Sequence, residues 1–291
     1  MDNQNHPFHA DASTQTPTTK TEPRPLSPAS TTLRPHIVIL DFHGEPTYPG
    51  PDHPSTHFND ALAEALSIQF NRHLMLHHLN TPESGLRHLQ KCTKYDAPIA
   101  VLIADSTITK PGTENRAVAA QLGEYVQNGG IVVLLPSFSQ GVVPQDLNHF
   151  FSDGLGLTWK YGRVVKTEGN FKNHMHGKSF LGLQSKVEFE GIQLASVPST
   201  EQVYLNLGRY LDASVTPVAW GRVGRGVVGY CCASKDGIAA VKFVVAMCST
   251  STTRAGRPEL GVEIPERWCR DADVWTDEDV SNSGDASEEA T

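Results

Sequence analysis

One stretch in the middle of the chain constrains the fold more than any other. Residues 113–128 carry apolar side chains at helical spacing, Gly129 and Gly130 follow them, and residues 131–135 are all apolar. A glycine-ended helix followed by a short apolar strand and a polar turn is typical of a parallel sheet. The turn after such a strand is where α/β folds hold their active sites. In this chain that turn, Pro136 to Ser139, contains no cysteine.

The same alternation of elements extends along most of the chain. Further short strands are predicted at 36–40, 72–78 and 99–104, and amphipathic helices at 55–69 and 82–92. Ser55 or Thr56 is expected to cap the first of these helices, and Thr113 the helix at 113–128. The later part of the chain predicts a short helix at 145–153, a hairpin of strands 215–220 and 227–232, and a closing helix at 238–248. Apolar strands that alternate with amphipathic helices predict an α/β fold with a mostly parallel sheet covered on both faces.

The two ends of the chain differ from the rest in composition. Residues 1–34 are rich in Ser, Thr, Pro, Asn and Gln without apolar periodicity, so they are predicted to be disordered. Residues 258–291 hold eleven acidic and two basic residues, whereas the whole chain has a net charge of −8, so the remainder is nearly neutral. We therefore expect one domain at 35–249, with disordered tails at 1–34 and 250–291. The acidic tail is either a solubilising appendage or a docking segment for a basic partner.

Charge and cysteine content exclude several classes of protein. A near-neutral domain with an acidic tail lacks the clustered Lys and Arg that nucleic-acid binding needs. No signal peptide and no apolar run near membrane-spanning length occur in the sequence, so no membrane association is expected. The five cysteines are odd in number and two are adjacent, which argues against a disulfide framework. Reduced thiols in the cytoplasm are predicted, with the nucleus as the alternative, and no cofactor is predicted.

Polar side chains follow three of the predicted strands. Asp41 and His43 follow the first strand, Asp105 follows the strand at 99–104, and Ser137 and Ser139 follow the strand at 131–135. Parallel topology gathers such residues at one edge of the sheet, where they are candidates for a ligand pocket. The alternative is that Asp and Ser here only cap turns. Ser137 is also a weak candidate nucleophile, because no base beside it can be named.

Three other groups of residues suggest chemistry, and each has a simpler explanation. His43, His53 and His57 could bind zinc, but Pro54 is expected to break the helix that would align them, so solvated loop histidines are favoured and no metal is predicted. The pair Cys231-Cys232 is read as buried strand residues. Residues 224–226 (Gly-Arg-Gly) are read as a hairpin turn rather than a phosphate cradle, because no helix follows directly. The histidines at 73, 77, 78, 174 and 176 are expected at the surface.

Two segments resemble the class I glutamine amidotransferase-like superfamily, whose fold is a flavodoxin-like three-layer α/β sandwich. Residues 124–130 lead into the strand at 131–135 as in the trehalose-utilisation-like branch. Residues 217–220 and 224–230 resemble the late β-hairpin of that branch. A closer resemblance, over 34–249, is to an uncharacterised fungal group, through segments such as 105–111, 156–160 and 223–230. The resemblance implies a mostly parallel central sheet with a late hairpin.

The same resemblance predicts a degraded active site. Active members use a cysteine at the elbow after the strand and a histidine after the late hairpin. This chain has Ser137 at the elbow region, and residues 231–236 after the hairpin contain no histidine. We therefore expect a non-catalytic member that binds a small molecule or a protein partner of unknown identity. The alternative is a hydrolase or amidase with a rearranged site around Ser137.

Overall fold

The computed structural model describes residues 35–42, 54–70, 73–91, 97–139, 141–172, 183–206, 215–235 and 237–250. A six-stranded sheet in the order β2-β1-β3-β4-β10-β9 forms its centre. Five of these strands are parallel, and β9 pairs antiparallel with β10 at one edge. The strands are β1 (His36–Leu40), β2 (Met75–Leu79), β3 (Ala100–Ile103), β4 (Ile131–Leu134), β9 (Val218–Val223) and β10 (Gly226–Cys231).

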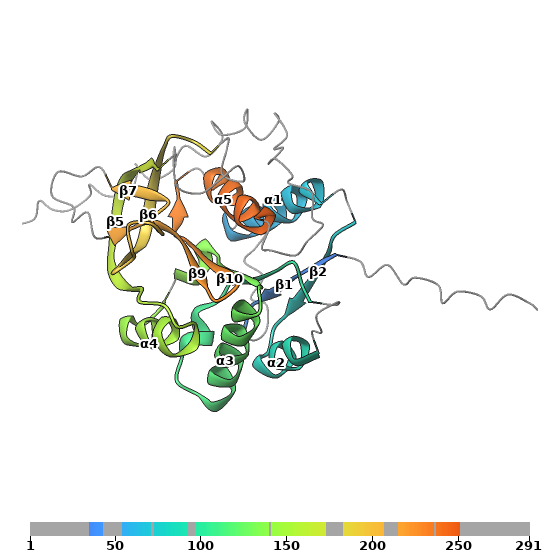
Figure 1. Ribbon diagram of the computed structural model, residues 1–291. Coiled ribbons are helices and arrows are strands. Elements are labelled where there is room, and N and C mark those ends of the chain that lie inside the picture. The colour runs from blue at the N-terminus through green and yellow to red at the C-terminus, as the bar shows by residue number, and fades with distance from the viewer. Residues whose placement is uncertain are drawn as a thin grey trace, which may run out of the picture. The chain divides into compact units, whose positions relative to one another are not determined.

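Helices cover both faces of this sheet. Helices α1 (Pro54–Gln69) and α5 (Ile238–Ser249) pack together on one face, and α2 (Pro82–Lys91) and α3 (Thr113–Gln127) pack together on the other (Figure 1). The order β2-β1-β3-β4-β10 matches the flavodoxin-like order 2-1-3-4-5. The predicted fold class, a flavodoxin-like three-layer α/β sandwich with a mostly parallel sheet and a late hairpin, is confirmed.

The predicted centre of the fold has the expected structure. Every residue of β4 is buried, and Val132 lies in register between Val101 of β3 and Val228 of β10. The turn before β4 contains Gly129 at φ 103°, a left-handed conformation that favours glycine. Strands β9 and β10 are joined by a tight turn in which Gly224 has φ 59°, so residues 224–226 form a hairpin turn as predicted.

A smaller sheet lies beside the central one. It has the order β11-β6-β5-β7, and β8 also pairs with β6. On its inner side Phe189 and Tyr204 pack against Phe243 of α5, with ring centroids 5.9 and 5.1 Å away. The strands are β5 (Lys160–Phe171), β6 (Lys186–Ala195), β7 (Tyr204–Asn206), β8 (Val215–Thr216) and β11 (Ala233–Ser234).

Several predicted boundaries were wrong. The strand at 215–220 is two strands, because Pro217 lacks an N–H and the chain passes there from the small sheet to the central one. Pro54 was expected to break a helix but begins α1, since a proline at the first turn loses no helical hydrogen bond. The N-cap of α3 is Gly112 rather than Thr113.

Two further expectations also differ from the structure. The helix predicted at 145–153 is α4 (Pro144–His149), continued by a single π-helical turn, η3 (Phe150–Gly154). His77 was expected at the surface but is half-buried, with its ring 5.3 Å from that of His36 and 5.6 Å from that of His88. His174 and His176 lie outside the described residues. Within the described ranges, no helix has both the length and the apolar character needed to cross a membrane.

The proposed disordered tails lie outside the described residues, so the domain limits stay a prediction. Limited proteolysis of the full chain should trim both ends and leave a fragment from about Arg34 to about Ser249, because apolar periodicity stops at both limits. The fragments are to be identified by mass spectrometry. A first cut between Val101 and Leu135 would contradict the assignment.

Candidate functional site

The carboxyl ends of β1, β3 and β4 lie next to one another, and they carry the polar residues chosen from the sequence. The backbone N–H of Ala104 donates to Leu40 O at 2.9 Å, and that of Leu135 donates to Ile103 O at 2.9 Å. The Ser137 hydroxyl donates to Ala104 O at 2.8 Å, which ties the end of β4 to the end of β3. Asp41 is exposed at the end of β1, whereas His43 lies outside the described residues.

Three of these polar side chains stabilise the turns in which they lie. The buried Asp105 accepts a hydrogen bond from the Thr107 N–H at 2.9 Å and so caps the 3-10 turn η1 (Ser106–Thr109). Ser139 donates to Pro136 O at 2.8 Å within the turn η2 (Pro136–Ser139). Among the described residues, Ala104 is the hydrogen-bond partner of the Ser137 hydroxyl, and no base contacts it. These contacts fit turn capping, and a ligand pocket at this edge stays a hypothesis.

Strand β6 passes close to the turn after β4 and to the end of β10. A Cβ atom placed on Gly191 would lie 3.7 Å from Ser139 Oγ and 3.8 Å from Cys232 Sγ. Tyr230 OH donates to Ile192 O at 2.6 Å and fastens β6 to β10. Burial raises the pKa of the Cys232 thiol far above its ordinary value, so the thiol stays protonated and is a poor nucleophile.

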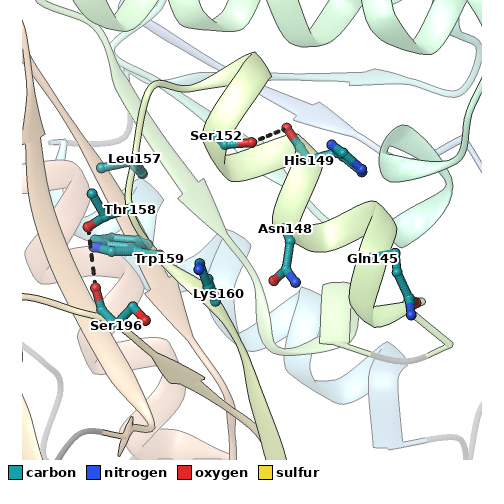
Figure 2. Close-up of a pocket in the computed structure, with 9 residues that line it drawn as sticks. All are labelled: Gln145, Asn148, His149, Ser152, Leu157, Thr158, Trp159, Lys160 and Ser196. Atoms are coloured by element: carbon teal, nitrogen blue, oxygen red, sulfur yellow. Dashed lines mark hydrogen bonds between the residues drawn. The ribbon is translucent and has the colours of Figure 1, made fainter.

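An open hollow of about 710 Å³ lies between α4 and the beginning of β5 (Figure 2). One wall is a polar stripe on α4 and η3, formed by Gln145, Asn148, His149 and Ser152 at helical spacing. The opposite wall consists of residues 157–160 and Ser196. In Figure 2 the residues of α4 and η3 lie on one side, and Leu157, Thr158, Trp159 and Ser196 lie on the other.

Trp159 gives the hollow a rigid wall. Its side chain is buried, and its Nε1–H donates to Glu201 Oε2 at 2.7 Å. Its ring meets Phe151 edge-on, with centroids 5.5 Å apart and planes at 70°. A rotamer change of this indole would break both the packing and the hydrogen bond, which costs free energy. This wall is therefore preformed.

The remaining lining side chains are mostly polar and carry few charges, although most of the surface exposed to the hollow is apolar. Asn148 Oδ1 accepts a hydrogen bond from the Tyr161 N–H at 2.7 Å, which fixes α4 against β5. Lys160 is exposed at the rim. On the other wall, His149 lies 3.3 Å from Asp153, and hydrogen bonds from Ser152 and from the His149 ring lower the pKa of the Asp153 carboxyl. The hollow therefore offers amide, hydroxyl and ammonium groups to a ligand.

Ser196 occupies a left-handed backbone conformation at this wall, with φ 56°. Its carbonyl accepts a hydrogen bond from Thr158 Oγ1 at 3.3 Å. A β-branched residue disfavours this conformation more strongly than serine, so Ser196→Val should lower the free energy of unfolding by about 1–2 kcal/mol, whereas Ser196→Gly should be nearly neutral or stabilising. Urea denaturation of both variants measures the difference. Equal stabilities would show that the turn relaxes freely.

Sequence reasoning missed this hollow because its walls come from separate segments. The spacing of residues 145, 148, 149 and 152 could have indicated a polar stripe opposite the apolar Leu147, Phe150 and Phe151. Nothing in the sequence pairs that stripe with Trp159 or Ser196. In the described part of the chain, no group of three or more His, Cys, Asp or Glu side chains is placed to hold a metal ion. His43 and His53 lie outside that part, and so does the side chain of His57.

Comparisons with known proteins add little beyond the fold. No protein-family model matches the sequence, and no curated protein is similar to it. A β-galactosidase from Bacillus circulans sp. alkalophilus matches 74% of this chain and 31% of its own, with 11% identity and a TM-score of 0.47. One from Halorubrum lacusprofundi matches 79% of this chain and 32% of its own, with 15% identity and a TM-score of 0.45.

A ThuA-like protein from Bacteroides uniformis is also similar in structure. The match covers 79% of this chain and 97% of that protein, with 13% identity and a TM-score of 0.45. The chain spans about a third of the length of the two β-galactosidases. Structural similarity this distant does not support a conclusion about activity or family. The fold assignment therefore rests on the strand order itself.

Proposed function

We propose that this chain is a non-catalytic, ligand-binding member of the class I glutamine amidotransferase-like superfamily, related to its uncharacterised fungal group. The proposal rests on a difference between the turn after β4, which is filled by the protein itself, and the hollow beside α4, which is open. The elbow after β4 has no cysteine, its serines are engaged in turn contacts, and Gly191 of β6 lies close beside Ser139. The hollow beside α4 is open, and several polar side chains lie around a surface that is mostly apolar.

The hollow suits a small molecule that is largely apolar and carries a few polar groups. Its volume of about 710 Å³ is within the range of small-molecule sites, which combine an aromatic or apolar wall with a few placed polar groups. Gln145, Asn148 and Lys160 supply polar groups, and the buried Trp159 and Leu157 pack behind the exposed lining. A neutral or singly negative molecule with hydroxyl or carbonyl groups fits this lining best.

A thermal-shift screen of small metabolites against the full chain tests this proposal. A true ligand should raise the melting temperature in a concentration-dependent way. Lys160→Ala and Gln145→Ala should each weaken that response, because both side chains line the hollow and neither makes a side-chain hydrogen bond or ion pair with another described residue. Lys110→Ala, at an exposed lysine on another segment, is the matched control and should leave the response unchanged. Equal responses in all three variants would place binding elsewhere.

The alternative, a hydrolase built around Ser137, makes a different prediction. A serine hydroxyl without a base is a poor nucleophile at neutral pH, so a fluorophosphonate probe should not label the protein. The comparison is between wild type and Ser137→Ala, read out by intact-mass spectrometry, with a known serine hydrolase as the positive control. Labelling of the wild type that disappears in Ser137→Ala would establish a serine nucleophile and overturn the non-catalytic proposal.

A further inference from the structure

Lys160 brings a positive charge to the hollow beside α4. Figure 2 places it between the α4 side and the side that carries Thr158 and Ser196. Its ammonium group forms neither a hydrogen bond nor an ion pair with any residue that the structure describes. His149, the other basic residue of the lining, is already engaged with Asp153 at 3.3 Å. The hollow therefore holds a charge that no described carboxylate balances.

The other lysines of β5 and β6 are paired with carboxylates across the two strands. Lys166 of β5 lies 3.5 Å from Glu190 of β6. Lys186 of β6 lies 3.2 Å from Glu168 of β5. Opposite charges on neighbouring strands contribute to strand pairing, so these lysines have a structural role. Lys160, at the beginning of β5, lies outside this pattern and lines the hollow instead, so its charge is available to a ligand.

Ser196 adds a hydroxyl group on a strained backbone. Within the described ranges it is the only non-glycine residue with a positive φ, at 56°. Strained residues of this kind cluster at ligand sites, where the surrounding structure holds them in place. Its carbonyl accepts from Thr158 Oγ1, whereas its own hydroxyl makes no hydrogen bond with a described residue. The Ser196 hydroxyl is thus available to a ligand.

Asn148 adds an amide donor whose orientation is fixed. Its Oδ1 accepts a hydrogen bond from the Tyr161 N–H at 2.7 Å, so its Nδ2 is the atom left to bind a ligand. With the Lys160 ammonium and the Ser196 hydroxyl, the hollow has three donor groups. A carboxylate accepts hydrogen bonds at two oxygens and donates none. This part of the lining therefore favours a carboxylate.

The three donors gather at the beginning of β5. Lys160 is paired in register with Ala195 of β6, which is the residue before Ser196. Asn148 is bonded to the backbone of Tyr161, which is the residue after Lys160. Each of the two neutral donors is therefore attached one residue away from the lysine or from its cross-strand partner. This placement lets one small group on a ligand contact all three.

The rest of the lining favours an apolar ligand body. Most of the surface exposed to the hollow is apolar, although Leu157 and Trp159 are almost fully buried. This apolar surface therefore consists largely of carbon atoms in the stems of the polar side chains. A hydrocarbon chain or ring laid on it would remove apolar area from water on both sides, which favours binding.

We infer, on the basis of the function proposed above, that the ligand of the hollow is a small amphipathic carboxylic acid. Lys160 is the counter-ion of its carboxylate, and Asn148 Nδ2 and the Ser196 hydroxyl donate to the carboxylate oxygens. One lysine balances one negative charge, so a monocarboxylate fits better than a phosphate dianion. The apolar body of the acid lies on the apolar part of the lining.

Calorimetric titration of the full chain with hexanoate, hexanamide and acetate, at neutral pH and matched ionic strength, tests the inference. Hexanamide has the same apolar body as hexanoate without the charge, and acetate has the carboxylate without the body. Hexanoate should bind about tenfold more tightly than either, because it alone makes both kinds of contact. Hexanoate that does not bind, or that binds no better than one of the other two, would overturn the inference.

Two variants locate the effect. Lys160→Met keeps the length of the side chain and removes its charge, so it should weaken hexanoate binding about tenfold and leave hexanamide binding unchanged. Ser196→Ala removes one donor, should weaken hexanoate binding about fivefold, and serves if the lysine variant does not fold. Lys166→Met, at an exposed lysine of the same strand, is the matched control and should bind hexanoate like the wild type. Undiminished hexanoate binding by a folded Lys160 or Ser196 variant would refute the site.

Gln145→Ala separates a failure of this inference from a failure of the proposed function. This variant alters the lining but leaves its charge intact. If hexanoate and hexanamide bind equally and both are weakened by Gln145→Ala, the hollow binds ligands but does not recognise a carboxylate, so only the inference falls. If binding is the same in Gln145→Ala and in Lys110→Ala, the ligand lies elsewhere, and the proposed function falls with the inference.

Discussion

Val132→Asp should unfold the domain or lower its melting temperature by more than about 10 °C. Val132 is fully buried in β4, with Val101 on one side and Val228 on the other in register. Helices cover both faces of the sheet, so a carboxylate at this position has no route to water and no described cation beside it. Burying an unpaired charge costs at least about 4 kcal/mol, which is a large part of the total stability of a domain.

Val164→Asp is the matched control for this experiment. Val164 also lies in a strand, but it is 66% exposed on the outer face of β5, so the new charge stays hydrated. Its melting temperature should stay within a few degrees of the wild type. Thermal denaturation of the three proteins, followed by circular dichroism, measures the difference. A soluble Val132→Asp protein that melts cooperatively near the wild-type temperature would contradict the assignment of β4 as a central strand.

The central sheet could be predicted because its signals are local. A strand that is buried on both faces is expected to be apolar throughout, and 37–40, 99–104 and 131–135 satisfy this. Parallel strands also require crossover helices, so the helices confirm the strands. The turn glycines at 129, 130 and 224 fix where these elements end.

The small sheet could not be derived in the same way. Strand β5 mixes charged, apolar and small residues and contains Gly162 and Gly169, so its own sequence does not distinguish a strand from a loop. It becomes a strand by pairing with β6, which lies beyond residues 173–182 in the chain. Pairing of this kind depends on distant contacts rather than on local preference.

The sheet edge after β1, β3 and β4 and the hollow beside α4 also differ in how far the sequence predicts them. The edge that holds Asp41, Asp105 and Ser137 follows from parallel topology alone, so its residues could be named from the sequence. The contacts that tie Ser137 to Ala104 depend on the detailed course of the turns, and the sequence did not reveal them. The hollow beside α4 needed the small sheet, because Trp159 and Ser196 flank β5 and β6.

Gly226→Ala should destabilise the domain by about 3 kcal/mol or more, although it adds only one methyl group. Gly226 begins β10 where that strand passes the end of α3. A Cβ atom here would lie 2.2 Å from the carbonyl oxygens of both Val126 and Gly130. Both are backbone atoms, and Gly130 O also accepts the hydrogen bond from the Val227 N–H at 3.1 Å, so neither can yield without moving β10 away from β4.

Gly112→Ala separates this steric effect from the general effect of replacing glycine. Gly112 has an extended backbone, and a Cβ atom there would make an ordinary contact of 3.8 Å with Asn115. As the N-cap of α3 it should lose only about 0.5 kcal/mol on substitution by alanine. Urea denaturation of both variants gives the comparison. Equal losses at the two positions would mean that β10 does not pass close to the α3–β4 turn, and the late hairpin would then have to leave the central sheet.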